Sequence, residues 1–270
     1  MISRRNGTKA ALDAGRTVYG TLMSVSSPRL VEFCALGGAE CVVFDMEHHP
    51  FSLESLEDLV RACEVCDITS IARTNDHSPT AIWRLLSLGF QGIFVPRVET
   101  AEEARLLVEA TRYPPEGTRG VDLARGSGYG RAVPTVQHVR TANREVLVGI
   151  TVESARGLAE IDRIVRVEGI DVVNVGAGDL SASMGHGADP AHPAVASAVR
   201  RIVESTRERG KAPGTAFADP TQVPGLLQAG YRFLTSSISS VVIDRVGELA
   251  RTVHGEQGRR STPTGKGAEK

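Results

Sequence analysis

Apolar residues in this chain form short continuous runs, and stretches of helical spacing separate them. Runs without an apolar–polar alternation are typical of parallel strands that are buried on both faces. Eight runs begin near Thr17, Cys41, Thr69, Gly92, Val146, Asp171, Ala212 and Phe233. Helical patterns cover 7–15, 28–36, 53–66, 79–88, 101–111, 155–165, 193–209, 221–228 and 241–253.

Eight strand–helix units after a short N-terminal helix predict an α/β fold, a closed (β/α)8 TIM barrel. A doubly wound open sheet is the alternative, but no Gly-rich phosphate loop follows the first strand. Residues 1–254 are expected to form a single barrel domain. The polar tail 255–270 is expected to be disordered. The irregular section from Arg112 to about Pro134 is longer than a simple connection, and such loops are usually functional or mobile.

Composition excludes several classes of function. The 270 residues are 41% hydrophobic and 23% charged, with a formal net charge of −1. Without a basic excess, neither a nucleic-acid nor a membrane-surface partner is expected. No apolar run approaches the roughly 20 residues that cross a bilayer, which favours a cytoplasmic protein. The four cysteines lie in apolar patterns typical of reduced thiols, although Cys63 and Cys66 have a C-x-x-C spacing that also occurs in redox and zinc sites.

Two acids stand where neighbouring strands end. Glu153 follows the fifth run, and Asp179 follows the sixth behind a Gly-Ala-Gly turn. Both could simply cap the helices that follow. As a pair on one rim, they are the ligands expected for Mg²⁺, Mn²⁺ or Co²⁺, with water or substrate oxygens at the remaining positions.

Other polar residues end strands on the same rim. Arg73 closes the third strand and is expected to meet a substrate carboxylate or an oxyanion, unless it pairs with Glu47 or Asp45. Asp45 precedes His48 by three residues and could orient its imidazole for acid–base work. None of the four lysines is expected on this rim, so a Schiff base is excluded and enolate chemistry would need a metal.

Several motifs resemble the HpcH/HpaI aldolase and citrate lyase family of metal-dependent pyruvate aldolases. They are Phe44-Asp-Met-Glu-His48, Arg73, the Arg112-Tyr-Pro-Pro-Glu-Gly-Thr-Arg-Gly120 run, Val152-Glu153 and Gly176-Ala-Gly-Asp-Leu-Ser-Ala-Ser-Met-Gly185. The similarity extends from about residue 17 to 253. It implies a barrel of the phosphoenolpyruvate/pyruvate-domain type, assembled as hexamers, trimers of dimers in which neighbours exchange the last helix.

The resemblance also implies roles for individual residues. Glu153 and Asp179 would hold the metal, and the backbone around Gly178 would hold the substrate carboxylate. Arg73 would stabilise the enolate of a 2-oxo acid, and His48 would handle the proton on the hydroxyl group of the aldol. The implied substrates are a small 2-oxo acid and an aldehyde.

Two positions depart from the family pattern. Ser87 replaces an Asp that pairs with the catalytic His, so Asp45, Glu47 or a water would have to take its place. Thr151 replaces a Gln two residues before the metal-binding Glu, and both Ser87 and Thr151 are expected to contact the substrate. The leading hypothesis is therefore a class II aldolase or lyase that acts through a metal-stabilised pyruvate enolate. The alternatives are an oxaloacetate decarboxylase or another enolate-based carbon–carbon bond-forming enzyme, and a non-enzymatic barrel for assembly or ligand sensing.

Overall fold

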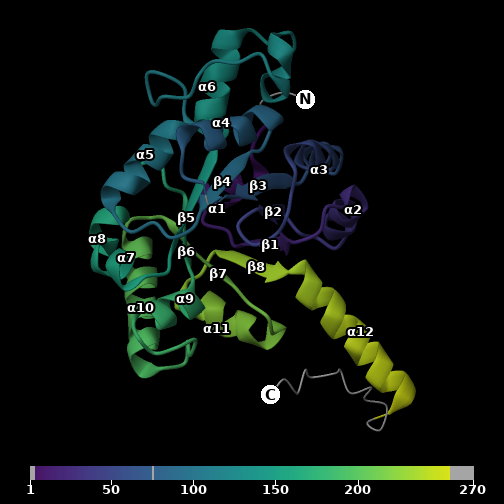
Figure 1. Ribbon diagram of the computed structural model, residues 1–270, viewed down its shortest axis with the longest axis vertical. Helices are drawn as coiled ribbons and strands as arrows, with labels where there is room; N and C mark the ends of the chain where they lie inside the picture. Colours follow the sequence, from purple (N-terminus) through teal and green to yellow (C-terminus); the bar gives the residue numbers. More distant parts are fainter. Residues whose placement is uncertain (1–3, 75, 256–270) are drawn as a thin grey trace, which may run out of the picture.

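The strands form the closed parallel barrel that the apolar runs predict. The computed structural model describes residues 4–74 and 76–255. Within it the strands follow one another around the barrel in chain order, and the last pairs with the first (Figure 1). They are β1 (Val18–Met23), β2 (Cys41–Asp45), β3 (Thr69–Arg73), β4 (Gly92–Val95), β5 (Leu147–Val152), β6 (Val172–Val175), β7 (Ala212–Ala216) and β8 (Phe233–Ser237). The (β/α)8 prediction is confirmed; most of the predicted tail, 256–270, lies outside the described residues.

Most helices also lie where the helical spacing predicts them. They are α1 (Gly7–Asp13), α2 (Pro28–Leu36), α3 (Leu53–Val65), α4 (Pro79–Leu88), α5 (Ala101–Thr111), α10 (Pro193–Glu208), α11 (Val223–Ala229) and α12 (Ile238–His254). The stretch predicted as one helix over 155–165 is two, α7 (Ala155–Ala159) and α8 (Ile161–Ile164). Two helices were not predicted, α6 (Thr135–Glu145) and α9 (Ala177–Ser183), and two short 3₁₀ helices occupy 125–130 and 220–222.

Side chains alternate along each strand between the barrel interior and the surrounding helices. Cys41 and Val43 of β2 belong to the inner apolar cluster, whereas Val42 and Phe44 belong to the cluster beneath the helices. Continuing the alternation turns Asp45 inward at the end of β2, beside its register partner Arg73. The same alternation turns Thr151 and Glu153 inward at the end of β5. The upper interior of the barrel is therefore polar.

Helix α1 closes the opposite, N-terminal end of the barrel. Its Ala11 and Leu12 are buried within the inner apolar cluster. The preceding Asn6 caps the helix and donates to the backbone carbonyls of Gln91 and Glu145, at the starts of two strands. This arrangement leaves only the C-terminal end of the barrel open for chemistry.

The remaining predictions concern cysteines and membranes. Cys34, Cys41 and Cys63 are buried free thiols and Cys66 is a half-buried one. Among the described residues, no group of three or more His, Cys, Asp or Glu side chains is placed to hold a metal ion, which removes support for a zinc site at Cys63 and Cys66. No helix in this part of the chain is long and apolar enough to span a membrane.

Candidate functional site

Glu153 and Asp179 lie at the C-terminal ends of two neighbouring strands, and Glu47 is near enough for its charge to act on Glu153. Glu153 comes directly after β5, and Asp179 lies in the first turn of α9, which follows β6. The register pairs Val152 with Val175, so these two strands end side by side. Burial raises the pKa of Glu153 to about 7, and the negative charges of Glu47 and Asp179 add to this rise. The site therefore carries a concentration of negative charge that a bound cation would offset.

Neither predicted metal ligand is a helix N-cap. Ser154 caps α7 with its hydroxyl, which accepts from the amide of Gly157 at 3.0 Å. Gly176 occupies the N-cap position of α9, so Asp179 lies inside that helix. The alternative explanation of the two acids as caps is wrong, and their carboxylates are available for another task.

The backbone around these carboxylates is shaped to fit them. A Cβ atom at Gly176 would come within 2.4 Å of a Glu153 carboxylate oxygen, so a side chain there would displace it. A Cβ atom at Gly178 would meet nothing within 4 Å, which shows open space beside the backbone. Arg97 has a φ of 56°, an uncommon conformation for a residue other than glycine, and its amide and charge act to lower the pKa of Glu153.

Arg73 lies against Asp45, as the salt-bridge alternative supposed. The Nε of Arg73 donates to one Asp45 oxygen at 2.9 Å, and Nη2 lies 2.8 Å from the other. Glu47 lies 3.5 Å from Nε. Burial would raise the pKa of Asp45, which is 1% exposed, but the hydrogen bonds and charge of Arg73 lower it overall. Asp45 thus fixes the position of the guanidinium group.

The expected pairing of Asp45 with the His48 imidazole is wrong. The amides of Glu47 and His48 both donate to Asp45 Oδ1, at 3.1 and 3.3 Å, which folds the chain into a turn. That turn brings His49 back, and its Nδ1 lies 2.8 Å from Asp45 Oδ2. The His48 ring is 62% exposed, and its Nε2 lies 3.5 Å from Glu47. Glu47 is therefore the carboxylate beside His48.

The two residues that depart from the family pattern lie in different parts of the barrel. Thr151 is 3% exposed and points inward one pleat below Glu153. Ser87 lies near the C-terminal end of α4, and its hydroxyl is hydrogen-bonded to Asp122. Because α4 runs back from the end of β3 to the start of β4, Ser87 lies at the N-terminal face. Within one chain Ser87 therefore lies at the end of the barrel opposite His48 and Arg73, and its place in the substrate site stays a prediction.

The residues present fit a hard divalent cation. Carboxylate oxygens are the ligands that Mg²⁺ and Mn²⁺ prefer, and two protein carboxylates leave positions for water and substrate. Lys9 and Lys211 lie at the opposite face: Lys9 pairs with Asp171, and Lys211, just before β7, donates to two backbone carbonyls that precede β6. These two lysines are thus remote from the carboxylates.

Sequence reasoning gave Glu47 and Arg97 too little weight. Glu47 appeared only as an alternative partner of His48 or Arg73, yet it also contributes to the pKa of Glu153. Arg97 was assigned no role, although its position directly after Pro96 at the end of β4 is the same signal that identified Arg73. Both lie at strand ends on the functional rim.

Comparisons with known proteins agree with this geometry. A model of the HpcH/HpaI aldolase/citrate lyase family matches residues 19–243. A curated protein of Escherichia coli named 4-hydroxy-2-oxo-heptane-1,7-dioate aldolase is 34% identical over 260 residues, which is 96% of this chain and 98% of that protein. A protein of the same name from Klebsiella pneumoniae is 36% identical over 253 residues, with 92% and 94% covered.

Solved structures show the same likeness. An HpcH/HpaI aldolase/citrate lyase family protein from Burkholderia cenocepacia J2315 superposes with a TM-score of 0.87 at 31% identity, covering 92% of this chain and 99% of that one. A citrate synthase, SbnG, superposes with a TM-score of 0.81 at 28% identity, covering 91% and 96%. Both similarities span nearly the whole of each chain.

Proposed function

Because the chain belongs to the HpcH/HpaI aldolase/citrate lyase family, we propose that it makes or cleaves a carbon–carbon bond beside the keto group of a small 2-oxo acid, with an aldehyde as co-substrate. The observation that carries this proposal is the position of Glu153 and Asp179 at the ends of two neighbouring strands, where burial, and then the charges of Glu47 and Asp179, raise the pKa of Glu153 to about 7. A divalent cation is the proposed cofactor, since it would offset that charge.

Each residue has a definite task in this proposal. Glu153 and Asp179 hold the cation, whose chemistry when bound is Lewis-acid polarisation of the keto oxygen. Arg73, held by Asp45, directs Nη1 toward the negative charge that develops on that oxygen. The open backbone at Gly178 receives the substrate carboxylate. Thr151, one pleat below Glu153, borders the floor of the site.

His48 is the proposed acid–base group for the hydroxyl group of the aldol. Its ring is exposed at the rim, and a carboxylate oxygen of Glu47 lies 3.5 Å from Nε2. Glu47 is therefore the proposed partner of His48, in place of an Asp at position 87. His49 is held by Asp45 and serves to fix the turn.

The direct test is metal-dependent release of pyruvate from a 4-hydroxy-2-oxo acid, measured with a coupled reductase. Protein stripped with EDTA should be inactive, and Mg²⁺, Mn²⁺ or Co²⁺ should restore activity. Asp179→Asn should abolish this restoration, whereas Asp189→Asn, an exposed acid in the loop beyond α9, should leave it intact. Full activity of the stripped protein in EDTA would contradict the proposal.

A second candidate is decarboxylation of oxaloacetate, or bond formation that starts from it. The likeness to a structure called a citrate synthase supports this version, as does the serine at position 87. Rapid pyruvate formation from oxaloacetate and Mg²⁺ without an aldehyde, together with no cleavage of 4-hydroxy-2-oxo acids, would favour the second candidate over the first.

We also propose that the protein is a homo-oligomer, assembled through α12. Figure 1 shows α12 leading away from the barrel. Val242, Val246, Leu249 and Val253 are 49–75% exposed and recur at helical spacing along one side. A second copy of the chain is the proposed partner. Val246→Asp should lower the mass measured by light scattering, and Arg251→Asp on the opposite side should not.

A further inference from the structure

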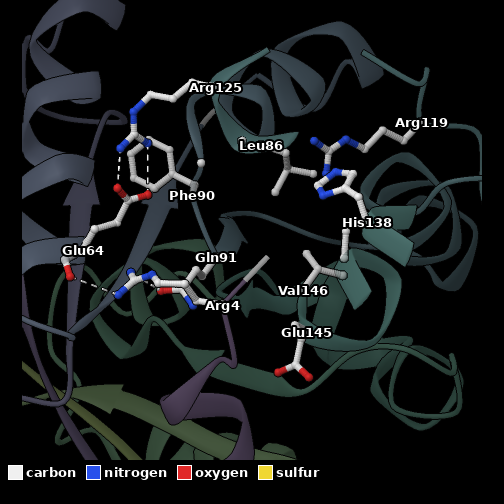
Figure 2. A pocket seen from close by; sticks show the side chains of 13 residues that line it. Arg4, Glu64, Leu86, Phe90, Gln91, Arg119, Arg125, His138, Glu145 and Val146 are labelled. Atoms are coloured by element: carbon white, nitrogen blue, oxygen red, sulfur yellow. Dashed lines mark hydrogen bonds and ion pairs between the residues drawn. The ribbon is translucent and has the colours of Figure 1, made fainter. Parts of the chain in front are cut away.

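A second polar cavity lies at the N-terminal face, away from the carboxylates. It has a volume of about 60 Å³. Its walls come from the end of α4, the section 112–134, α6 and the N-terminal segment, as Figure 2 shows. On this measure a single water molecule needs roughly 10–15 Å³, so the cavity has room for a ligand of a few heavy atoms.

Arg119 lines this cavity and is 5% exposed. Its Nε is buried and has no hydrogen-bond partner within residues 4–74 and 76–255. The guanidinium carbon lies 4.4 Å from the centre of the Tyr113 ring, which offers a weak attraction. Burial lowers the pKa of Arg119, and the nearby Tyr113 and Asp122 only partly oppose this effect. A buried cation with so little compensation is unusual.

The other arginines of the cavity are satisfied by the protein. Arg125 forms an ion pair with Glu64 and donates to the Leu88 carbonyl at 2.8 Å. Arg4 donates to the Gln91 side chain at 2.9 Å (Figure 2). Arg119 is therefore the cation of this cavity whose charge a bound anion would neutralise.

The remaining lining limits what that ligand can be. Burial lowers the pKa of His138, and the charge of Arg119 lowers it further, so at neutral pH this ring adds no positive charge. Glu64 and Glu145 also line the cavity and oppose a second negative charge. Leu86, Phe90 and Val146 provide an apolar wall, and Figure 2 shows Leu86 facing the Arg119 guanidinium. A ligand with one negative charge and a short apolar chain therefore fits this lining.

We propose that this cavity binds a short aliphatic monocarboxylate, whose carboxylate pairs with Arg119. A planar guanidinium group can bind both carboxylate oxygens at once, and the apolar wall receives the alkyl end. Binding would stabilise the section 112–134, which carries Arg119, against unfolding. This site is separate from the proposed catalytic rim, because the two lie at opposite ends of the barrel.

The experiment measures propionate binding by calorimetry at constant ionic strength on metal-free full-length protein in EDTA. Propionate lacks the keto group, and the absence of metal keeps the proposed catalytic site from contributing. The wild type should bind saturably. Arg119→Gln should weaken binding by roughly tenfold or more, because a charged hydrogen-bond pair is lost. Arg131→Gln, which removes an exposed arginine of the same section, should leave it unchanged.

A second variant distinguishes loss of the binding site from misfolding of the Arg119→Gln protein. Ala142→Leu fills the cavity from α6 while Arg119 stays in place, and it should also prevent binding without lowering the melting temperature. Propionate binding that survives both variants, or no saturable binding by the wild type, would overturn the proposal. Phosphate that competes with propionate at equal concentration would overturn the assignment of a monocarboxylate.

Discussion

The two ends of this barrel carry unbalanced charge of opposite sign. At the C-terminal end, burial and the charges of Glu47 and Asp179 raise the pKa of Glu153, while at the N-terminal end Arg119 is buried with little compensation. The acids lie at an open rim where solvent and ligands enter, and Asp179 is exposed. The arginine is buried and lines a cavity whose wall includes the long connecting section 112–134. In one barrel, the strand ends can therefore form one site, and the segments that close the opposite face can form another.

The same comparison separates structural charge from functional charge. Arg125 at the N-terminal face and Arg73 at the rim are both paired with acids. Arg125 is 5% exposed in its side chain, whereas the Arg73 side chain is 20% exposed and borders open space. We therefore expect loss of Arg125 to affect stability and changes at the rim to affect chemistry. The following variants test this division.

The largest effect is expected for Glu153→Gln. The variant keeps the shape of the side chain but removes a proposed metal ligand, so the rate of pyruvate release should fall on the order of 1,000-fold. Steady-state kinetics with saturating Mn²⁺ measures it. Glu99→Gln, a nearby acid that pairs with Arg156 at 3.4 Å, is the matched control and should retain activity. Equal losses in the two variants would mean that Glu153 has no special role.

Arg125→Met should act on stability. Removing one partner of a buried ion pair leaves Glu64 uncompensated, which costs about 3 kcal/mol of unfolding free energy. Urea denaturation followed by circular dichroism measures the change. Arg61→Met breaks exposed contacts with Glu57 and Asp58 and should leave the midpoint unchanged. Similar midpoints for both variants would show that the Arg125 pair contributes little.

Metal binding should depend on pH around neutrality. Glu153 has a pKa of about 7 in the metal-free protein, and only its ionised form is a ligand. Affinity for Mn²⁺ should therefore fall about tenfold for each unit below pH 7 and level off above it. Calorimetry between pH 5.5 and 8.5 measures this profile. Glu47→Gln removes a neighbouring negative charge, so it should move the midpoint to lower pH; an unmoved midpoint would exclude Glu47 as a cause.

The smallest effect concerns the stability of the metal-free protein. In the folded state the pKa of Glu153 is about 7, which is above its ordinary value of 4.5. As the pH rises from 4.5 through 7, ionisation of Glu153 therefore increasingly favours the unfolded state. Glu153→Gln should therefore melt about 2–4 °C higher than the wild type at pH 8. The difference should vanish at pH 4.5. Differential scanning calorimetry in EDTA at the two pH values measures it, and a lower melting temperature at pH 8 would contradict the raised pKa.

The strands were predictable because buried parallel strands need continuous apolar runs, and each observed strand begins within one residue of its prediction. Helix α6 was not predictable in this way. Its buried residues, His138 and Asn143, are polar, so burial leaves no apolar periodicity in the sequence. The section 112–134 was expected to be functional or mobile. Its buried Tyr113, Arg119 and Arg125 show that it packs against the barrel, through contacts too distant in sequence to predict.

The candidate site was predictable to the level of residue types at strand ends. Glu153 and Asp179 were found because each ends an apolar run. The partner of Asp45 was assigned wrongly, since the choice between His48 and His49 depends on a turn formed by two amides on one carboxylate oxygen. The location of Ser87 at the N-terminal face was not predictable either, because motif similarity gives no direction along a helix. Turn geometry and helix direction are properties of the fold, and the local amino-acid sequence carries no signal for them.

The closure of the barrel by α1 has a consequence for synthesis on the ribosome. Ala11 and Leu12 belong to the same buried cluster as Phe233, which is translated 221 residues after Leu12 (233 minus 12). At roughly 5–20 residues per second, Phe233 is synthesised about 10–45 seconds after Ala11 and Leu12. The nascent chain therefore exposes its first helix for most of its own translation, and binding of chaperones to this segment is expected to last until the final strand emerges.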